Sequence, residues 1–392
     1  MVSLRTIFTV VLPLSLAASA TCTSVISNSV LADIASKANA TNEYGEIAAI
    51  RTFFYVGGGY EVVGSGHLYT NQMYIEKLVP VHGVTKRTPI VLIHGQAQTG
   101  TNWLIKPDGS RGWASNFIEQ GYEVYIVDQT FRGRSAWKPQ AGATTPSTYS
   151  AEIIQQRFTA VKDYMLWPQA ASHTRWPGTG KMDDSVFDTF YSSNVEFINN
   201  ATYQQTTVQR AGAALLDKIG RPVILIGHSQ GGIMPIVIAD ARPDLTKGLI
   251  LLEPTGPTFR EGVFSTSAAR AYGLTDIPLT YSPAVSDPAT DLVKQEYPAR
   301  GENYLSCLLQ AEDSVRTLPN LAPKPIIVVT SEASYHAPYD YCVVNYLKQA
   351  GCSRTQGLEL ADIGIHGNAH MFFMEDNSRQ IQSVLAGWIE RI

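Results

Sequence analysis

A serine, Ser229, stands between two glycines in the segment Gly227-His-Ser-Gln-Gly231. The four residues 223–226 before it are apolar without polar alternation, which is typical of a central strand in a parallel sheet covered on both faces. A serine between such a strand and a helix is exposed as a nucleophile, because the flanking glycines let strand and helix approach closely. The spacing therefore predicts acyl-transfer chemistry at Ser229, with an ordinary glycine-rich turn as the alternative.

A serine hydroxyl is a poor nucleophile by itself, and it needs a histidine base and an acid that orients the imidazole. In open parallel sheets these groups lie in loops that directly follow strands. The loop 364–371 contains two histidines. We predict His370 as the base, because it stands just before the closing helix after a Gly-Asn turn. His366 follows the last strand directly and suits a packing role.

The predicted acid is Glu253. It ends the apolar run 249–252 in the strand expected beside the one that leads to Ser229. Its carboxylate is therefore expected at the same edge of the sheet as the serine. The order serine, acid, histidine along the chain agrees with this assignment.

The loop after the strand expected at 325–330 is the more usual place for such an acid. In this chain Ser334 stands at the position where an aspartate would be expected. Glu332 and Asp340 lie in or next to the same loop. Both remain alternatives to Glu253.

Two backbone N–H groups are expected to stabilise the negative oxygen that forms during acyl transfer. One belongs to Gln230, at the start of a helix whose N-terminal end carries a positive partial charge. The other is expected from Gln96, in the loop after the buried strand 88–93, where Gly95 allows the backbone to turn inward.

Two arginines, Arg132 and Arg134, lie in the loop 128–135 that follows the strand 123–127. One interpretation is a clamp for a carboxylate of the substrate. The other is that the guanidinium groups bind backbone carbonyls and organise the loop. We favour the second interpretation for Arg132.

Strand and helix patterns alternate along the chain. This alternation predicts an α/β fold with a mostly parallel sheet covered by helices on both faces. The expected strands are 47–55, 67–79, 88–93, 123–127, 223–226, 247–252, 325–330 and 358–363. The expected helices are 113–119, 151–167, 203–219, 233–241, 302–313, 340–350 and 378–392.

The first two strands are expected as an antiparallel pair at the edge of the sheet, around a break at the glycines 57–59. Residues 21–45 are small and polar, which predicts a loosely attached arm. Pro235 falls in the first turns of the helix after Ser229, where a missing N–H is expected to loosen the helix start.

Two long stretches interrupt the alternation of strands and helices, and we expect them to form caps over the sheet. They span residues 136–200 and 254–321, so that residues 21–392 form a single domain with two insertions. The aromatic residues that could line a pocket beneath these caps are Trp103, Trp137, Trp167, Trp176 and Phe187.

The 392-residue chain is 44% hydrophobic with a net charge of −4 and an isoelectric point near 6.1. This balance of charges does not predict binding to nucleic acid or to an anionic membrane, which requires clustered lysine and arginine side chains.

Arg5 precedes a short apolar run and small residues, which predicts a cleaved signal peptide at 1–20 and a secreted, soluble protein. The run is too short to cross a bilayer. The expected partner is a small molecule.

Four cysteines, Cys22, Cys307, Cys342 and Cys352, favour two disulfides in an oxidising compartment. We expect Cys307 to pair with Cys342 or Cys352, and Cys22 to hold the N-terminus. A Cys342–Cys352 bond is disfavoured, because ten residues of helix separate the two thiols by about 15 Å. No metal-ligand spacing accompanies these cysteines, and no metal or cofactor is expected.

Two Asn-x-Thr sequons stand at Asn39 and Asn200. Both are candidate glycosylation sites if the host is eukaryotic and their loops are exposed.

The motifs together resemble those of the α/β-hydrolase superfamily, and in particular its secreted serine esterases with a glutamate after the sixth strand. The matching segments are Leu92-Ile-His-Gly95, Asp128 to Ser135 with its Arg-Gly-Arg, Gly227-His-Ser-Gln-Gly231 followed by Pro235, and Gly367-Asn-Ala-His-Met371, together with Glu253. The stretch 254–321 is longer than the corresponding loop of that group.

This resemblance implies an eight-stranded α/β-hydrolase fold with lid insertions. It also implies hydrolysis of carboxylic esters through an acyl-enzyme on Ser229, without a cofactor. A lactonase or a carbon–carbon bond hydrolase using the same residues is an alternative. So is a non-catalytic binding protein of the same fold, although the intact serine, histidine and turn glycines argue against it.

Overall fold

The structure is a computed structural model, and it describes residues 25–38, 43–138 and 145–392. The predicted signal peptide, Cys22 and the sequon at Asn39 lie outside these residues. Among the helices that the structure describes, none combines the length and the apolar character needed to cross a bilayer.

An eight-stranded sheet forms the centre of the molecule, in the order β1-β2-β4-β3-β7-β8-β11-β12. Strands β1 and β2 pair antiparallel, β2 is antiparallel to β4, and the six strands from β4 to β12 run parallel. The α/β prediction with a mostly parallel sheet is therefore confirmed. The bounds of the eight strands are β1 Ala49–Val63, β2 Gly66–Pro80, β3 Ile90–Ile93, β4 Val124–Asp128, β7 Val223–His228, β8 Thr246–Leu252, β11 Ile326–Thr330 and β12 Thr355–Glu359.

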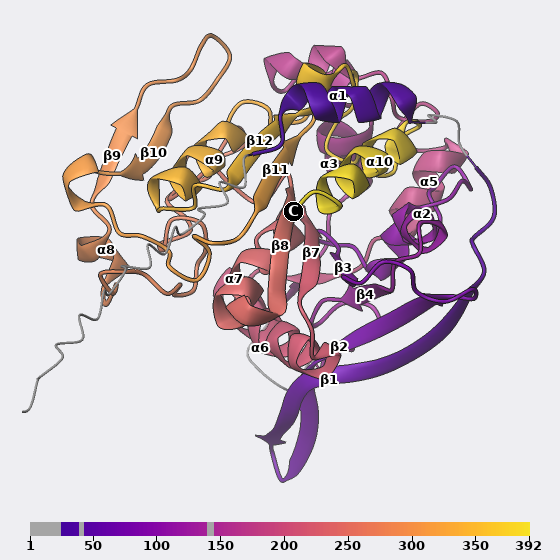
Figure 1. Cartoon of the computed structure of the whole chain (residues 1–392), viewed down its shortest axis with the longest axis horizontal. Coiled ribbons are helices and arrows are strands. Elements are labelled where there is room, and N and C mark those ends of the chain that lie inside the picture. The colour runs from indigo at the N-terminus through magenta and orange to yellow at the C-terminus, as the bar shows by residue number, and fades with distance from the viewer. Residues whose placement is uncertain (1–24, 39–42, 139–144) are drawn as a thin grey trace, which may run out of the picture.

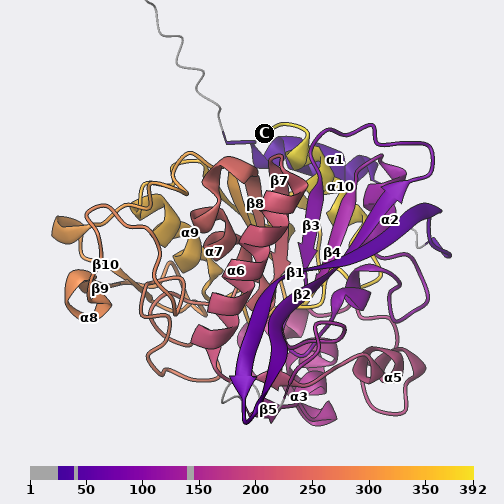
Figure 2. The ribbon, with the colours of Figure 1, turned by 90° about the horizontal axis from the view of Figure 1, so that it is seen from below.

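Helices cover both faces of this sheet (Figures 1 and 2). Val223 and Leu225 of β7 belong to the core under α6, α7 and α9, whereas Ile224 and Ile226 belong to the core under α1, α2 and α10. Alternate residues of one apolar strand are thus buried on opposite sides, as expected for a central parallel strand. These helices are α1 Asn28–Lys37, α2 Trp113–Glu119, α6 Ala201–Ile219, α7 Met234–Ala241, α9 Asp340–Gln349 and α10 Ser378–Ile389.

Short elements lie in the two long connections. Between β4 and α6 they are β5 Pro146–Ser147, α3 Ala151–Ile154, the π-helical turn Gln155–Thr159, α4 Val161–Tyr164, α5 Ser185–Ser192 and β6 Phe197–Ile198. Between β8 and β11 they are α8 Pro288–Asp291, β9 Lys294–Tyr297 and β10 Cys307–Gln310. The continuous helix expected at 151–167 is therefore wrong, since a π-helical turn divides it.

The helix expected at 302–313 is also wrong. Cys307–Gln310 forms strand β10, which pairs antiparallel with β9. Cys307 is buried in this strand and forms a disulfide with Cys342 of α9, with 5.2 Å between the Cα atoms. This bond is one of the two predicted pairings. Cys352 is buried as a free thiol in the described chain.

Three further expectations need correction. The glycines 57–59 do not break the first strand, since β1 continues through them. Gly57 is instead required by packing, because a Cβ there would lie 2.8 Å from Ala211 of α6. The last strand ends at Glu359, and a 3-10 turn occupies Leu360–Ile363. Within the arm expected at 21–45, helix α1 packs against α10 and buries Leu31.

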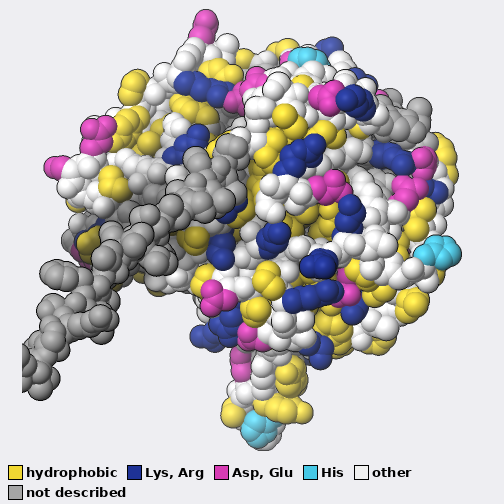
Figure 3. Space-filling view, in the orientation of Figure 1, with side chains coloured by type: hydrophobic (Ala, Val, Ile, Leu, Met, Phe, Trp, Pro, Cys, Tyr) yellow, Lys and Arg dark blue, Asp and Glu magenta, His cyan; other side chains and the backbone are white. Residues whose placement is uncertain are grey.

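Charged side chains of both signs are interspersed on the face shown in Figure 3, as the small net charge predicts. Figure 3 also shows apolar side chains at the projecting end of the β1–β2 hairpin, where Tyr60 and Val62 are exposed.

Candidate active site

Ser229 lies in a sharp turn between strand β7 and helix α7. Its backbone adopts the left-handed conformation, with φ 57°, which is rare for a residue other than glycine. A Cβ on Gly227 would lie 2.0 Å from the carbonyl oxygen of Gly231, and one on Gly231 would lie 2.1 Å from that of His94. The two glycines are therefore required by close backbone contacts, and they hold Ser229 in its strained position.

The start of the helix after Ser229 is irregular, as expected for Pro235, because a bend at Ile233 separates a 3-10 turn from the α-helix. The turn Ser229–Gly232 is a 3-10 helix, and α7 begins afterwards at Met234. Pro235 thus stands in the first turn of α7, where a helix has no internal acceptor for an N–H group and proline is favoured.

We expect Gly227→Ala to lower the free energy of unfolding by about 3 kcal/mol, because the added methyl group meets a backbone oxygen that cannot move freely. Gly59→Ala is the control, since a Cβ there has no atom within 4 Å. Urea denaturation of both variants measures the difference. Equal midpoints for the two variants would contradict the close-packing argument.

The structure brings the predicted base and acid together. The Nδ1 atom of His370 lies 2.6 Å from Oε2 of Glu253, and both side chains are buried. Glu253 follows β8 with a left-handed backbone, φ 45°, which is another rare conformation at this edge of the sheet. On the opposite side of the ring, Nε2 of His370 lies 3.4 Å from the hydroxyl group of Tyr335.

Four donors surround the Glu253 carboxylate. Ser331 donates its backbone N–H and its hydroxyl to Oε1 at 2.8 and 2.6 Å. Ser334 donates its hydroxyl to Oε2 at 2.6 Å, beside His370. The position where the sequence lacks an aspartate therefore supplies a hydroxyl group to the glutamate. These hydrogen bonds fix the position of the carboxylate beside His370.

The alternative acids lie elsewhere. Glu332 accepts a hydrogen bond from the backbone N–H of Gly367 at 2.9 Å and lies 3.3 Å from His366. Asp340 pairs with Nδ1 of His336 at 2.9 Å and accepts the hydroxyl group of Thr330. Neither carboxylate is paired with His370 in the described structure.

Burial sets the charge state of the histidines around the site. Burial lowers the pKa of His370 well below its usual value, and the neighbouring His336 lowers it further. Burial also lowers the pKa of His336 to about 4, although Glu253 raises it. The two rings are stacked with centroids 4.9 Å apart. Both imidazoles are therefore neutral at pH 7, and Nε2 of His370, which lies 3.4 Å from the hydroxyl group of Tyr335, can accept a proton.

One atom each of Glu253, His336 and His370 lie within 4.8 Å of one another, and this group is the possible metal site within the described residues. The carboxylate already accepts four hydrogen bonds, one of them from His370. A metal ion would have to replace those bonds. The donor arrangement thus fits a hydrogen-bonded acid and base better than a set of metal ligands.

Gln96, one of the two predicted oxyanion residues, lines the same pocket as Ser229. The backbone N–H of Gln96 has no acceptor among the described residues, and the side chain of Gln96 accepts the hydroxyl group of Tyr149 at 2.6 Å. A Cβ on Gly95 would lie only 3.2 Å from Cβ of Ser229. Gly95 thus lets the loop that carries Gln96 approach the serine, as predicted from the sequence.

Arg132 lies behind this loop and is fully buried. Its guanidinium group donates to the side-chain oxygen of Gln230 at 2.9 Å and to the carbonyl of Gly95 at 3.4 Å. Burial lowers the pKa of Arg132 to about 9. Arg132 therefore organises the two segments that flank Ser229, as favoured above. Arg134 instead pairs with Asp128 and Glu76, and neither arginine lines the pocket.

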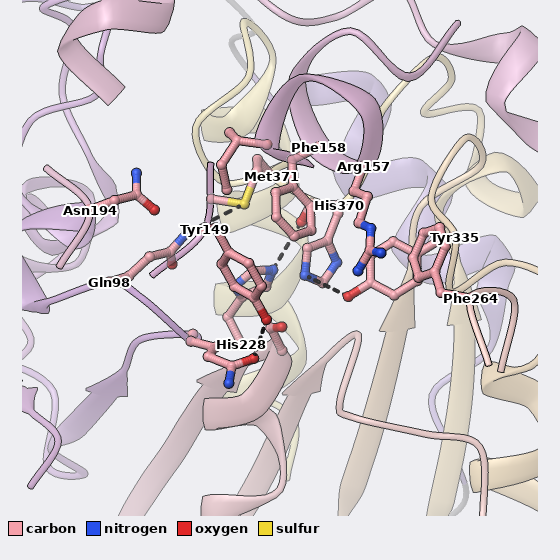
Figure 4. A pocket seen from close by; sticks show the side chains of 14 residues that line it. Gln98, Tyr149, Arg157, Phe158, Asn194, His228, Phe264, Tyr335, His370 and Met371 are labelled. Carbon is pink, nitrogen blue, oxygen red and sulfur yellow. Dashed lines mark hydrogen bonds between the residues drawn. The ribbon is translucent and has the colours of Figure 1, made fainter. Parts of the chain in front are cut away.

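The pocket above Ser229 is a small cavity of about 70 Å³ (Figure 4). None of the five aromatic residues proposed from the sequence lines it, because Trp103, Trp167, Trp176 and Phe187 are packed in the hydrophobic cores. The residues that line it are Gly95, Gln96, Gln98, Tyr149, Ile154, Arg157, Phe158, Asn194, His228, Ser229, Phe264, Tyr335, His370 and Met371.

Two lining residues that sequence reasoning missed contact the base. Phe158 stacks on His370 with ring centroids 5.2 Å apart, and the Tyr335 ring lies beside both, 4.8 Å from that of His370 and 6.1 Å from that of Phe158. Burial raises the pKa of Tyr335 well above its usual value, and a hydrogen bond with Ser229 opposes this shift. Tyr335 could have been suspected from its loop, which directly follows a strand; no motif marked Phe158 or Arg157.

Comparisons with known proteins agree with this arrangement. A model described as the alpha/beta hydrolase family matches residues 90–381. Probable secreted lipase phiG of a fungal species is 44% identical over 342 residues, which cover 87% of this chain and 90% of that protein. Lipase LipV of Mycobacterium tuberculosis is 43% identical over 65 residues, or 15% of this chain and 25% of that protein.

A solved structure of a novel bacterial esterase shares the fold, with a TM-score of 0.59 and 22% identity, over 89% of this chain and 98% of that one. The segment matched by the family model contains Ser229, Glu253 and His370. The chain therefore belongs to the alpha/beta hydrolase family.

Proposed function

We propose that this protein is a serine hydrolase of carboxylic esters that acts through an acyl-enzyme on Ser229. The observation that carries the proposal is the 2.6 Å contact between His370 and Glu253, with His370 and Ser229 facing one pocket. A relative that covers most of the chain is named a lipase, which supports ester chemistry. The substrate is a small-molecule ester, and no cofactor takes part.

In the proposed reaction, Oγ of Ser229 attacks the ester carbonyl while Nε2 of His370 takes the hydroxyl proton. The backbone N–H groups of Gln96 and Gln230 hold the negative oxygen of the tetrahedral intermediate, a contribution of about 3 kcal/mol for each donor. The C–O bond then breaks, and His370 returns the proton to the leaving alcohol. Water attacks the acyl-enzyme by the same route and releases the carboxylic acid.

Glu253 keeps the Nδ1–H of His370 directed away from the substrate. Its ionised carboxylate also stabilises the imidazolium that forms when His370 accepts the proton. Ser331 and Ser334 hold the carboxylate in place through their hydrogen bonds.

The same proposal extends to location and domain layout. Residues 1–20 are a signal peptide, and residues 21–392 form one secreted domain with caps at 136–200 and 254–321. The Cys307–Cys342 disulfide and the name of the fungal relative support export. Asn200 is exposed at the start of α6 and suits glycosylation.

The test is an assay of the purified protein on aryl, short-chain, long-chain and lactone esters, combined with labelling by a fluorophosphonate. We expect ester turnover and a single labelled peptide that contains Ser229. Labelling of a different residue, or no turnover across the panel, would contradict the proposal.

The pKa of His370 predicts the pH dependence. A protonated His370 cannot accept the proton of Ser229, so activity is present above the pKa of His370 and is lost as the pH falls through it. Because burial lowers that pKa, we expect the acid limb of kcat/KM on a neutral ester to have its midpoint below 6.5. A pH–rate profile measures it, with circular dichroism to exclude unfolding. A midpoint at or above 6.5 would refute this account.

A further inference from the structure

One charged residue in the pocket has no part in the proposed mechanism. Arg157 stands in the π-helical turn Gln155–Thr159 and lines the same pocket as Ser229 and His370. Figure 4 shows its guanidinium group extending from that turn into the space near Tyr335 and Phe264. Turns of this type are rare and frequently occur at functional sites.

The positive charge of Arg157 has no carboxylate partner within 4.0 Å in the described ranges, and the remaining residues contain no Asp or Glu. None of its N–H groups donates to a described residue. Several other arginines are paired with carboxylates, such as Arg134 with Asp128 and Arg300 with Glu359. The guanidinium of Arg157 is therefore available for a negative group that enters from outside.

The surroundings hold this guanidinium in place without neutralising it. Its central carbon lies 4.0 Å from the centre of the Phe264 ring, a cation–π contact that leaves the N–H groups at its edge free. The acidic residues nearby are already occupied: Glu261 pairs with Arg270 at 2.9 Å, and Glu253 accepts its four hydrogen bonds. The pocket thus presents one uncompensated cation beside Ser229.

We propose that Arg157 binds a carboxylate of the substrate, so that the preferred substrates are esters that also carry a free carboxylate. The planar guanidinium presents two parallel N–H donors that match the two oxygens of a carboxylate. This inference rests on the proposed ester hydrolysis and adds the class of ester. The carboxylate belongs either to the acyl part or to the alcohol part of the substrate.

Two pairs of esters distinguish these sources. Monoethyl adipate against ethyl pentanoate places the carboxylate in the acyl part, and 4-acetoxybutanoate against butyl acetate places it in the alcohol part. A series of monoethyl esters of dicarboxylic acids, from succinate to suberate, then shows which distance between the ester and the carboxylate gives the fastest turnover. Turnover is followed by NMR at low ionic strength, because salt screens a half-exposed charge pair.

We expect the wild-type protein to prefer the carboxylate ester by about 10-fold or more in kcat/KM in one of the two pairs. Arg157→Met should abolish this preference by raising KM for the carboxylate ester, while turnover of the neutral ester stays within about 2-fold of the wild-type value. Arg300→Met is the matched control, since Arg300 also lies 4.0 Å above an aromatic ring but outside the pocket.

Competitive inhibition gives a second measurement that does not depend on a folded variant. Pentanoate should inhibit the wild-type protein at a concentration about 10-fold lower than its uncharged analogue pentanamide does. The inference is overturned if neutral esters are hydrolysed as well as carboxylate esters in both pairs, or if the preference survives in Arg157→Met. Failure of the proposed function would look different, because no ester in either pair would be hydrolysed.

Discussion

Replacing Ser229 with alanine is expected to lower kcat for ester hydrolysis by about 10⁴- to 10⁶-fold. The substitution removes the attacking oxygen while the oxyanion donors and the pocket remain. Some activity over the uncatalysed reaction should therefore persist, because those groups stabilise the transition state without a covalent step. Initial rates on p-nitrophenyl acetate, measured with enough protein to detect the residual activity, give the loss directly.

The fold should tolerate this change. Alanine at φ 57° is as strained as serine, and the replacement removes only one oxygen atom from a half-buried position. We expect the unfolding midpoint of Ser229→Ala to stay close to that of the wild-type protein. Fluorophosphonate labelling that persists in this variant would show that the nucleophile is another residue.

Glu253→Gln is expected to lower kcat by about 10⁴-fold. A neutral amide can present its NH₂ group to Nδ1 of His370, which would place the imidazole proton on the nitrogen that must accept one from Ser229. It also removes the negative charge that stabilises the imidazolium. Steady-state kinetics on the same ester measure the loss, and KM should change little because Glu253 does not line the pocket.

Two isosteric variants serve as controls for this assignment. Glu332→Gln changes a carboxylate that contacts Gly367 and His366, and it should retain kcat within about 3-fold of the wild-type value. Asp340→Asn changes the partner of His336. If either variant loses as much activity as Glu253→Gln, the acid has been assigned to the wrong residue.

The sequence predicted those parts of the structure that depend on local pattern. The apolar run before Ser229 predicts a strand that is buried on both faces. The glycines on either side of the serine predict a tight turn, because they allow strand and helix to approach closely. Glu253 and His370 each follow a strand, and the carboxyl ends of parallel strands share one edge of a sheet. Their contact followed from topology without any knowledge of side-chain packing.

The remaining features depend on contacts between distant segments, which a local pattern does not contain. Strand β10 is fixed by pairing with β9 and by the disulfide to α9, so its residues were mistaken for a helix. The glycines 57–59 suggest a break in the strand when only the local pattern is considered, whereas close contact with α6 explains Gly57. The aromatic residues chosen for the pocket were large enough to fill the cores, and burial there outweighed any place at the surface.

The acid shows the same limit in a single residue. The sequence shows that Ser334 stands where an aspartate would be expected, but it does not show what the serine does there. In the structure its hydroxyl binds the glutamate that arrives from the neighbouring strand. A sequence shows which residue is absent from a position, but it does not show which side chain reaches that place from elsewhere.

Arg157 and Phe158 are consecutive residues of the π-helical turn, and both line the pocket. Phe158 also stacks on His370. Exchange of the Arg157 side chain alters the charge in the pocket and leaves the ring on the base in place. A rearrangement of the backbone in this turn moves both side chains, so that it changes the preferred substrate and the turnover rate together.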